Sequence, residues 1–336
     1  MGISGDRIFA LPALLRQLRL NFSKQEEFIR KSIAVDIREV QKDNDGTLSD
    51  KDFKKIYTYY GLAVVSVLGE GFCLLRGKKM SLAERDQLTY MGALTGLFDD
   101  FFDEKETDEQ HIRELINRPR SSLVNNSYEE LFIRFYLKAL DRTNSDLVKE
   151  KLNRVCDAQV RSKQQKDSGI SDKDIQSITM EKGGASLLFY RCAFPEELSE
   201  SEQQMLYTLG GLGQLENDIF DVYKDYHERV RTLATTTERI SDLKSIYVSL
   251  MKDVFRMVDQ TDYPARNKKE FSRFISLISA RGLVCLDHLK KLETLTGGVF
   301  DLSLYSGENL ICDMEKVTSR LKLMRYYGLI CRRKLF

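Results

Sequence analysis

The sequence predicts an all-α protein, and two observations support this fold class. Apolar residues recur three and four positions apart in many segments, among them 25–40, 128–140, 241–258 and 271–292, which is the spacing of one helix face. The 336 residues include only four prolines, so long stretches are free to be helical, and alternating strand-like runs are scarce. We therefore expect roughly ten or more helices in a single large bundle that spans residues 1–336.

Polar segments mark where these helices should end. Residues 41–52, 117–127, 162–174 and 260–270 are rich in Asp, Asn, Ser, Gly and Pro, and each is expected to form a loop. No period of about 30–40 residues repeats, which argues against a solenoid. No segment has the composition of an interdomain linker, which favours one domain.

Composition limits the possible partners and the compartment. The 52 basic and 51 acidic residues leave a net charge of +1, so no overall field favours nucleic acid or an anionic membrane. The six cysteines are scattered without a CxxC pair, which argues against a zinc site or disulfide framework and suits a reducing cytoplasm. No uninterrupted apolar run approaches ~20 residues, so we expect no transmembrane helix. The sequence predicts a cytoplasmic protein and leaves open whether it forms a homodimer.

The first cluster of chemical interest is the segment GLFDDFFDEKETD (96–108), which follows a largely apolar helix. Residues four apart share a helix face, so Asp99 and Asp103 should project together, with Asp100 and Glu104 as a second stripe. Like charges at this spacing repel unless something positive lies between them. Paired carboxylates at the end of a buried helix suggest a metal ion, and a solvated acidic face is the alternative.

A second cluster, in 210–232, has the same design. Asn217, Asp221 and Asp225 lie at i, i+4 and i+8, which predicts one continuous helical stripe, with Asp218 and Lys224 beside it. The preceding segment, MLYTLGGLGQL, is apolar and rich in glycine, which permits close helix packing. Two such helices could together offer the oxygen ligands that Mg²⁺ prefers, and Mg²⁺ in proteins commonly shares its ligands with substrate phosphates.

Between the clusters lies EKGGASLLFYRCAF (181–194), which offers cations. Lys182 precedes Gly183 and Gly184, and Arg191 follows within an aromatic stretch. A diphosphate needs direct cationic donors as well as metal ions, so Lys182 and Arg191 are candidate phosphate contacts. The alternative is that the Lys-Gly-Gly sequence is simply a turn in a loop.

These motifs together resemble the class I isoprenoid (terpenoid) synthases. Asp99-Asp100-Phe-Phe-Asp103 is similar to their first motif, DDxxD, and 217–225 is similar to their second, NDxxSxxxE, with Asp221 in place of Ser and Asp225 in place of Glu. Read from Gln214, the same stretch also resembles the QxxDDxxD of chain-elongating prenyltransferases. The Lys182–Ser186 element is similar to one in the tetraprenyl-β-curcumene synthase-like group. The resemblance covers about residues 60–230, so the helices within 1–58 and the C-terminal segment lie outside it.

The resemblance implies a fold, a cofactor and a reaction. The fold would be the all-α bundle of these synthases, and three Mg²⁺ ions would bind the diphosphate of a linear prenyl diphosphate, the expected small-molecule partner. Metal ligands would be Asp99, Asp103, Asn217, Asp221 and Asp225, with Asp100 in a supporting role; Lys182, Arg191 and Lys224 would donate to phosphate oxygens. Ionisation to an allylic cation, followed by cyclisation, deprotonation or capture of water, would release pyrophosphate, making this a terpene synthase, that is, a carbon–oxygen lyase.

Two other readings of the chain remain open. A prenyltransferase that elongates or couples prenyl chains is disfavoured because the segment after Asp103 lacks the Arg-Arg pair of those enzymes. A non-catalytic helical interaction module that keeps the fold is the second, although intact carboxylates in both motifs oppose it. Near the C-terminus, Arg325-Tyr326 is similar to the Arg-Tyr pair that closes over diphosphate in bacterial cyclases, and an exposed basic tail is the alternative there.

One further motif, QKDNDGTLSDKD (41–52), resembles an EF-hand loop. Gln41 occupies the first ligand position and Asp52 the twelfth, where a bidentate Glu is typical. The sequence lacks a second loop of this kind. We therefore favour a helix-capping turn over a calcium site.

Overall fold

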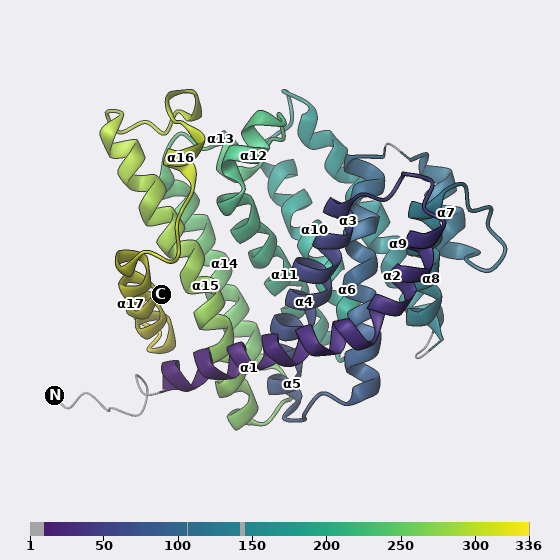
Figure 1. Ribbon diagram of the computed structural model, residues 1–336. Coiled ribbons are helices and arrows are strands. Elements are labelled where there is room, and N and C mark those ends of the chain that lie inside the picture. Colours follow the sequence, from purple (N-terminus) through teal and green to yellow (C-terminus); the bar gives the residue numbers. More distant parts are fainter. Residues whose placement is uncertain (1–9, 106, 142–144, 336) are drawn as a thin grey trace. The chain divides into compact units, whose positions relative to one another are not determined.

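The computed structural model describes residues 10–105, 107–141 and 145–335, and throughout these ranges the regular elements are helices (Figure 1). The all-α fold class predicted from the sequence is confirmed. The described residues divide into two compact units. The N-terminal unit holds residues 12–160 and 188–197, and the C-terminal unit holds 10–11, 161–187 and 198–335. The expectation of a single domain stays a prediction.

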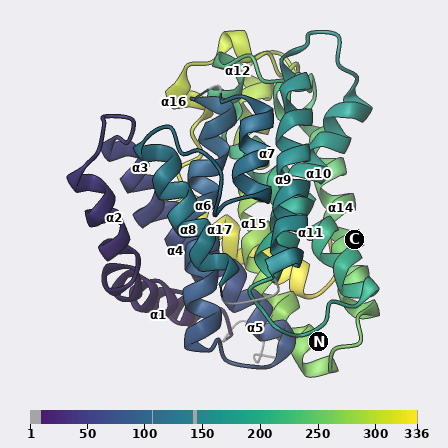
Figure 2. The ribbon, with the colours of Figure 1, turned by 90° about the vertical axis from the view of Figure 1, so that its right-hand side faces the viewer.

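The helices of the N-terminal unit are α1 (Ala10–Lys31, whose first two residues belong to the C-terminal unit), α2 (Ile33–Lys42), α3 (Asp50–Lys55), η2 (Ile56–Tyr60), α4 (Gly61–Ala63), η3 (Val64–Gly69), α5 (Glu70–Arg76), α6 (Leu82–Asp103), α7 (Glu109–Asn117), α8 (Ser127–Leu140) and α9 (Ser145–Ser162, whose last two residues belong to the C-terminal unit). The long helix α6 packs against α8 on one side and against the run from η2 to η3 on another (Figure 2). Its residues from Gln87 to Phe98 are all buried, so α6 is the central helix of this unit.

The run from α3 to α5 is continuous and contains two π-helical segments, η2 and η3. Residues Asp50–Arg76 are long and apolar enough to cross a membrane by length and composition alone. More than half of the most apolar stretch (56%) is buried inside the protein, which is the ordinary situation of a core helix.

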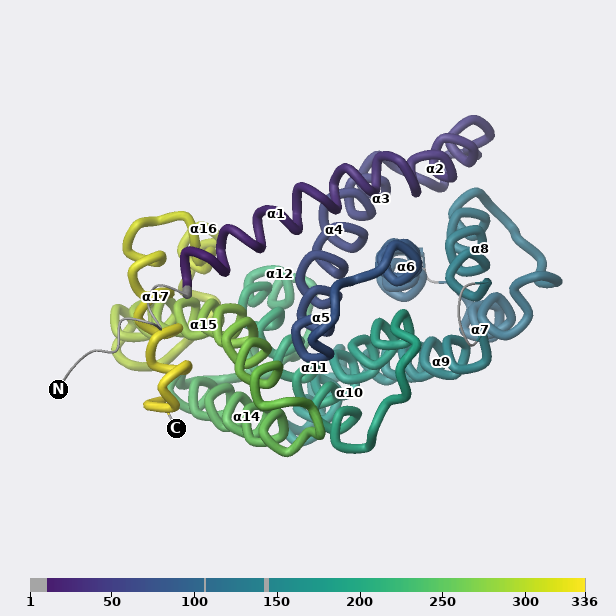
Figure 3. Tube along the Cα trace, turned by 90° about the horizontal axis from the view of Figure 1, so that it is seen from below, coloured from purple at the N-terminus to yellow at the C-terminus, as the bar shows by residue number. Residues whose placement is uncertain are grey.

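The helices of the C-terminal unit are η4 (Lys163–Lys166), α10 (Asp172–Arg191, whose last turn belongs to the N-terminal unit), α11 (Glu200–Phe220), α12 (Val222–His227), α13 (Leu233–Thr236), α14 (Ile240–Gln260), α15 (Ala265–Leu295), η5 (Leu302–Leu304), α16 (Gly307–Leu310) and α17 (Val317–Cys331). Helix α11 packs against α14, and α14 against α15. The C-terminal helix α17 lies beside α15 (Figure 3). This packing fixes the two ends of α11 relative to α14 and α15.

Local side chains explain where several helices begin. Ser81 and Glu84 form a reciprocal capping box at the start of α6, and the Ser199 hydroxyl accepts from the Glu202 N–H at the start of α11. The four predicted loops are present in trimmed form, as residues 43–49, 118–126, 167–171 and 261–264. The segment 25–40 is the exception among the predicted helices, because it divides at Ser32 into α1 and α2.

Candidate functional site

The first acidic motif occupies the last turn of α6, and Asp99 is held there by two donors. The Tyr60 hydroxyl lies 2.8 Å from its Oδ2, and the Gln159 amide nitrogen 2.5 Å from its Oδ1. The carboxylate is partly exposed, whereas Asp103 one turn later is exposed. Both side chains therefore remain accessible to a ligand, and Asp99 has its orientation fixed.

Glycines in α6 admit the tyrosine that holds Asp99. A Cβ at Gly96 would lie 2.6 Å from the Tyr60 ring, and a Cβ at Gly92 would lie 2.6 Å from the Tyr60 backbone oxygen. Gly92, Gly96 and Asp99 share one helix face. Tyr60 ends the π-helical segment η2, and π-helical turns are frequent at functional sites.

A lysine from α3 lies against the second stripe of the first motif, which consists of Asp100 and Glu104. Lys55 donates to both Asp100 oxygens, at 2.6 and 2.8 Å, and approaches Glu104 at 3.4 Å. Burial raises the pKa of Asp100 despite this pairing. Burial opposes the charge of Lys55, but the hydrogen bonds to Asp100 and Glu104 outweigh it and raise the Lys55 pKa. Asp100 is thus committed to an ion pair with Lys55, and its supporting role toward a metal stays a prediction.

Among the described residues, one group of three carboxylates has oxygens within 4.8 Å of one another, and it is Asp52, Asp100 and Glu104. Asp52 is buried, and its Oδ2 accepts from the N–H and hydroxyl of Ser49 in a capping box that starts α3. The helix-capping turn favoured for 41–52 is confirmed. Lys55 already lies between Asp100 and Glu104 and balances their charge, while Asp52 serves the helix cap.

The second motif lies at the end of α11. The predicted continuous stripe is wrong in one respect, because α11 ends at Phe220 and α12 begins at Val222, with a bend at Asp221 (φ −92°, ψ 10°). The Asn217 amide still donates to the Asp221 carboxylate at 3.1 Å, and the Asp225 N–H donates to the Asp221 carbonyl at 2.9 Å. The Asn217 and Asp221 side chains therefore stay in contact at the bend, and the Asp221 charge acts on Asp225.

Burial and repulsion perturb the carboxylates of this motif. Asp218 is buried and accepts from Gln214 at 2.8 Å and from Thr179 at 3.2 Å, and burial raises its pKa to about 6. Burial, reinforced by Asp218 and Asp221, raises the pKa of Asp225 to about 8. Asp218 and Asp225 therefore bind a proton more readily than an ordinary carboxylate, chiefly because they are buried.

Lys182 lies in the interior of α10 and not in a turn. Gly183 packs against Gly210 of α11 so closely that a Cβ at Gly183 would lie 1.9 Å from the Gly210 oxygen. A Cβ at Gly184 would lie 2.3 Å from the Tyr207 ring. The glycines therefore serve helix packing, which corrects the turn interpretation, and this packing brings the Lys182 charge to bear on Asp218 and Asp225.

The remaining candidate phosphate donors have different surroundings. Lys224 is exposed and lies 4.0 Å from Glu228. Arg191 is buried, and its guanidinium donates to the Phe194 and Glu196 carbonyls at 3.2–3.3 Å. Its described hydrogen bonds are thus structural, and its role toward phosphate stays a prediction.

Arg325 and Tyr326 belong to α17, which is packed on α15 and is no loose tail. Arg325 is exposed. The Tyr326 hydroxyl donates to Asp287 at 2.8 Å and accepts from Lys244 at 3.1 Å. Their predicted approach to a diphosphate stays a prediction.

Sequence reasoning missed the residues that hold the motifs in place. Tyr60, Gln159 and Lys55 support the first motif, and Thr179 supports the second. None has a recognisable spacing to the motif it serves. The GxxxG spacing of Gly92 and Gly96 ahead of Asp99 was the one available signal, since such a pair admits a bulky neighbour.

The aromatic residues near the first motif form ordinary core. Phe98 is fully buried, with Phe101, Phe102 and Phe132 centroids 5.4–6.3 Å away. These rings pack the buried face of the last turns of α6, and Asp99 and Asp103 lie on faces that solvent can reach.

The sequence matches no protein-family model and no curated protein. Among solved structures, a dehydrosqualene synthase in complex with ligand is similar to this chain, with a TM-score of 0.48 and 13% sequence identity over 95% of this chain and 99% of that one. The similarity to the tetraprenyl-β-curcumene synthase-like group stays a prediction.

Proposed function

We propose that this protein is a class I terpene synthase, a lyase that ionises a linear prenyl diphosphate with Mg²⁺ and releases pyrophosphate. The observation that carries the proposal is the second motif. The Asn217 amide donates to the Asp221 carboxylate at the bend between α11 and α12, Asp218 lies buried nearby, and both aspartates act on the charge of Asp225. Ionising these buried carboxylates costs stability, and a bound cation would offset that cost.

The residues present fit Mg²⁺. Carboxylate and amide oxygens are its preferred ligands, and the ion keeps positions for water and substrate phosphate. Each motif offers its own ligands, Asp99 and Asp103 in the first and Asn217, Asp221 and Asp225 in the second. When bound, Mg²⁺ supplies positive charge that stabilises the diphosphate as a leaving group.

The protein's own residues prepare this chemistry. Tyr60 and Gln159 orient the Asp99 carboxylate before any ligand arrives, which limits the reorganisation needed on binding. Lys182, positioned by the Gly183–Gly210 contact, would donate directly to a phosphate oxygen, and exposed Lys224 could follow it.

A chain-elongating prenyltransferase is the second candidate, and one contact favours it. Gln214 donates to Asp218 at 2.8 Å, so the first residue of the QxxDDxxD reading does support the acidic residues that follow. Such an enzyme would need a second diphosphate substrate. The two candidates therefore differ in their requirement for isopentenyl diphosphate.

The test is turnover of defined substrates by the purified protein. C10, C15, C20 and C25 prenyl diphosphates are incubated separately with Mg²⁺, with and without isopentenyl diphosphate; pyrophosphate release and extracted products are measured. A terpene from one substrate, lost in Asp99→Asn and Asn217→Ala but kept in the surface control Asp157→Asn, supports the synthase. A longer diphosphate that requires isopentenyl diphosphate identifies a prenyltransferase. No turnover and no Mg²⁺-dependent binding of pyrophosphate would leave the interaction module.

A further inference from the structure

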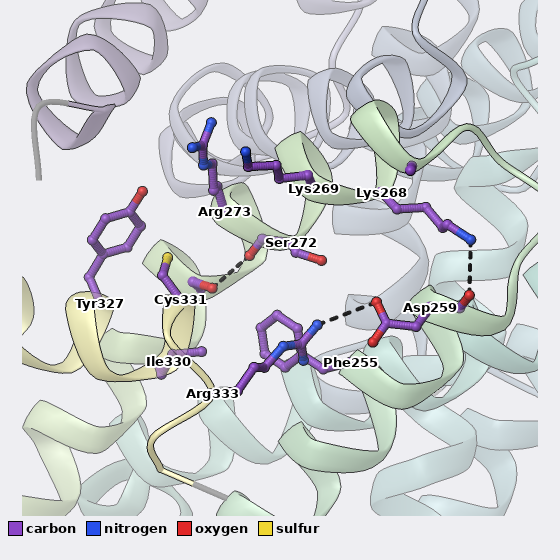
Figure 4. A pocket seen from close by; sticks show the side chains of 12 residues that line it. Phe255, Asp259, Lys268, Lys269, Ser272, Arg273, Tyr327, Ile330, Cys331 and Arg333 are labelled. Carbon is purple, nitrogen blue, oxygen red and sulfur yellow. Dashed lines mark hydrogen bonds and ion pairs between the residues drawn. The ribbon is translucent and has the colours of Figure 1, made fainter. Parts of the chain in front are cut away.

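The C-terminal unit contains a polar cavity whose lining includes none of the residues assigned to the proposed reaction. It has a volume of about 420 Å³ and lies where the end of α14, the first turns of α15 and the last turn of α17 meet (Figure 4). Its polar lining comes chiefly from Lys268, Lys269, Ser272, Arg273, Tyr327 and Arg333. A cavity of this size is in the range of small-molecule sites.

The cavity and the second acidic motif lie near opposite ends of α11. Near the start of α11, Glu202 accepts from Tyr263, which stands just before α15. Toward its other end, Glu216 accepts from Tyr247 of α14, immediately before the acidic motif. With a rise of 1.5 Å per residue, these two positions are ~20 Å apart along the helix. A ligand in the cavity would therefore not touch the metal-binding residues.

The lining carries more positive than negative charge. Four of its side chains are cationic, and Asp259 is its one carboxylate. Arg333 lies 3.5 Å from Asp259, and Arg273 donates to the neighbouring Glu270 at 2.7 Å. Even with Glu270 counted, two positive charges exceed the acidic ones, and exposed Lys269 is among the cations that face the cavity in Figure 4.

Arg333 is held in the cavity by an unusual backbone turn. It has a φ of 52°, in the left-handed region that few side-chain-bearing residues adopt. The Lys334 N–H donates to the Leu329 carbonyl and the Arg333 N–H to Ile330, which ends α17 in a Schellman turn. This turn sets the guanidinium 4.1 Å from the centre of the Phe255 ring, and burial there lowers the Arg333 pKa.

The start of α15 adds to the positive potential. Ala265, its first residue, lines the cavity. No side chain caps this helix start, and its first turn has no acidic residue. The 31-residue helix thus directs the positive end of its dipole at the same place as the cationic side chains.

We infer that this cavity binds an organic phosphate or diphosphate as a second, non-catalytic site. The cations and the helix start match a multiply charged phosphoryl group, and Arg and Lys are the side chains that recognise it. Phe255, Ile330 and Tyr327 supply an apolar wall for the rest of the ligand. The phosphoryl group could belong to a free metabolite or to a lipid head group.

The experiment measures binding without divalent cations, so that the proposed metal site cannot contribute. Pyrophosphate and geranyl diphosphate are titrated into the full-length protein in EDTA by calorimetry. A parallel arm measures sedimentation with phosphatidylcholine vesicles that do or do not contain phosphatidic acid. Binding of the soluble phosphates indicates a metabolite site, and binding confined to phosphatidic acid vesicles indicates a head group.

Variants connect any binding to this cavity. Lys269→Gln changes an exposed side chain and should weaken binding about tenfold, since one charge-assisted hydrogen bond is lost. Ser272→Leu should block the cavity sterically, and Lys291→Gln on the exposed part of α15 is the matched control. Equal affinity in all four proteins, or no binding in any arm, overturns the inference. Asp225→Asn should leave this binding intact, so failure of the proposed reaction would remain distinguishable.

Discussion

The two acidic motifs end helices of similar length, yet they balance their charge in different ways. In the first motif, Lys55 pairs with Asp100, while Tyr60 and Gln159 donate to Asp99. In the second, burial and neighbouring carboxylates raise the pKa of Asp225 to about 8, with Lys182 and Lys224 as the opposing charges.

This difference indicates a division of labour. The first motif has its carboxylates oriented and partly neutralised in advance, so it costs little to keep without a ligand. In the second, buried Asp225 binds a proton more readily, so protons should compete with a cation there and its affinity for a cation should depend more on pH. The following changes test that contrast.

The largest effect is expected when one carboxylate of each stripe in the first motif is replaced in turn and the two variants are compared. Asp99→Asn should lower kcat/KM for pyrophosphate release by ~100-fold or more, because an oriented metal ligand is weakened. Asp100→Asn should lower activity far less and instead reduce stability by about 1–3 kcal/mol, since its charge is paired with Lys55 inside the protein. Steady-state kinetics and urea unfolding of both variants are the measurements. Equal loss of activity in the two would contradict the division between stripes.

The next effect concerns the frame of the second motif. Gly183→Ala places a methyl group 1.9 Å from a backbone oxygen of Gly210, so α10 and α11 must separate, and we expect a loss of about 3 kcal/mol or more in stability. Gly213 is an exposed residue of α11, and a Cβ added there would meet nothing within 4 Å. Gly213→Ala should therefore raise the free energy of unfolding by up to about 1 kcal/mol. Chemical denaturation of the pair decides the matter, and a stable Gly183→Ala protein would show that this contact does not set the position of Lys182.

The fold class and the acidic motifs could be predicted because they depend on local spacing. Helix-period apolar residues predicted the helices, and the four-residue spacing of Asp100 and Glu104 predicted a repulsion that a positive charge would relieve. That the cation is Lys55 could not be predicted, because it comes from a helix 45 residues earlier in the chain. The bend at Asp221 could not be predicted either, because residues 217–225 contain no proline or glycine. The interpretation of the Lys-Gly-Gly sequence as a turn is wrong, because glycine occurs both in turns and where two helices pack closely.

The third prediction concerns pH. The Asp225 pKa rises from its ordinary 3.8 to about 8 on folding, so the folded protein binds more protons than the unfolded chain between those values. Stability without metal should therefore fall as pH rises from ~4 to ~8. Thermal unfolding gives the slope of the free energy of unfolding against pH. In Asp225→Asn this slope should be smaller by the equivalent of about one proton, and in Asn217→Ala it should be unchanged. Mg²⁺ with pyrophosphate should stabilise most at the high end. A slope that Asp225→Asn leaves intact would remove Asp225 as its source.

The smallest effect tests how much orientation matters in the first motif. Tyr60→Phe keeps the ring that lies against Gly96 and removes the hydroxyl 2.8 Å from Asp99. We expect a stability change of about 1 kcal/mol and a several-fold lower kcat, because Asp99 keeps Gln159 but loses its second constraint. Tyr59→Phe removes the hydroxyl of the neighbouring exposed tyrosine and serves as the control. If Tyr60 acts only in packing, both variants keep wild-type kcat and the same Mg²⁺ dependence. If it orients Asp99, the Mg²⁺ concentration for half-maximal rate rises in Tyr60→Phe alone, and the first motif is then preorganised by its neighbours in the way its contacts indicate.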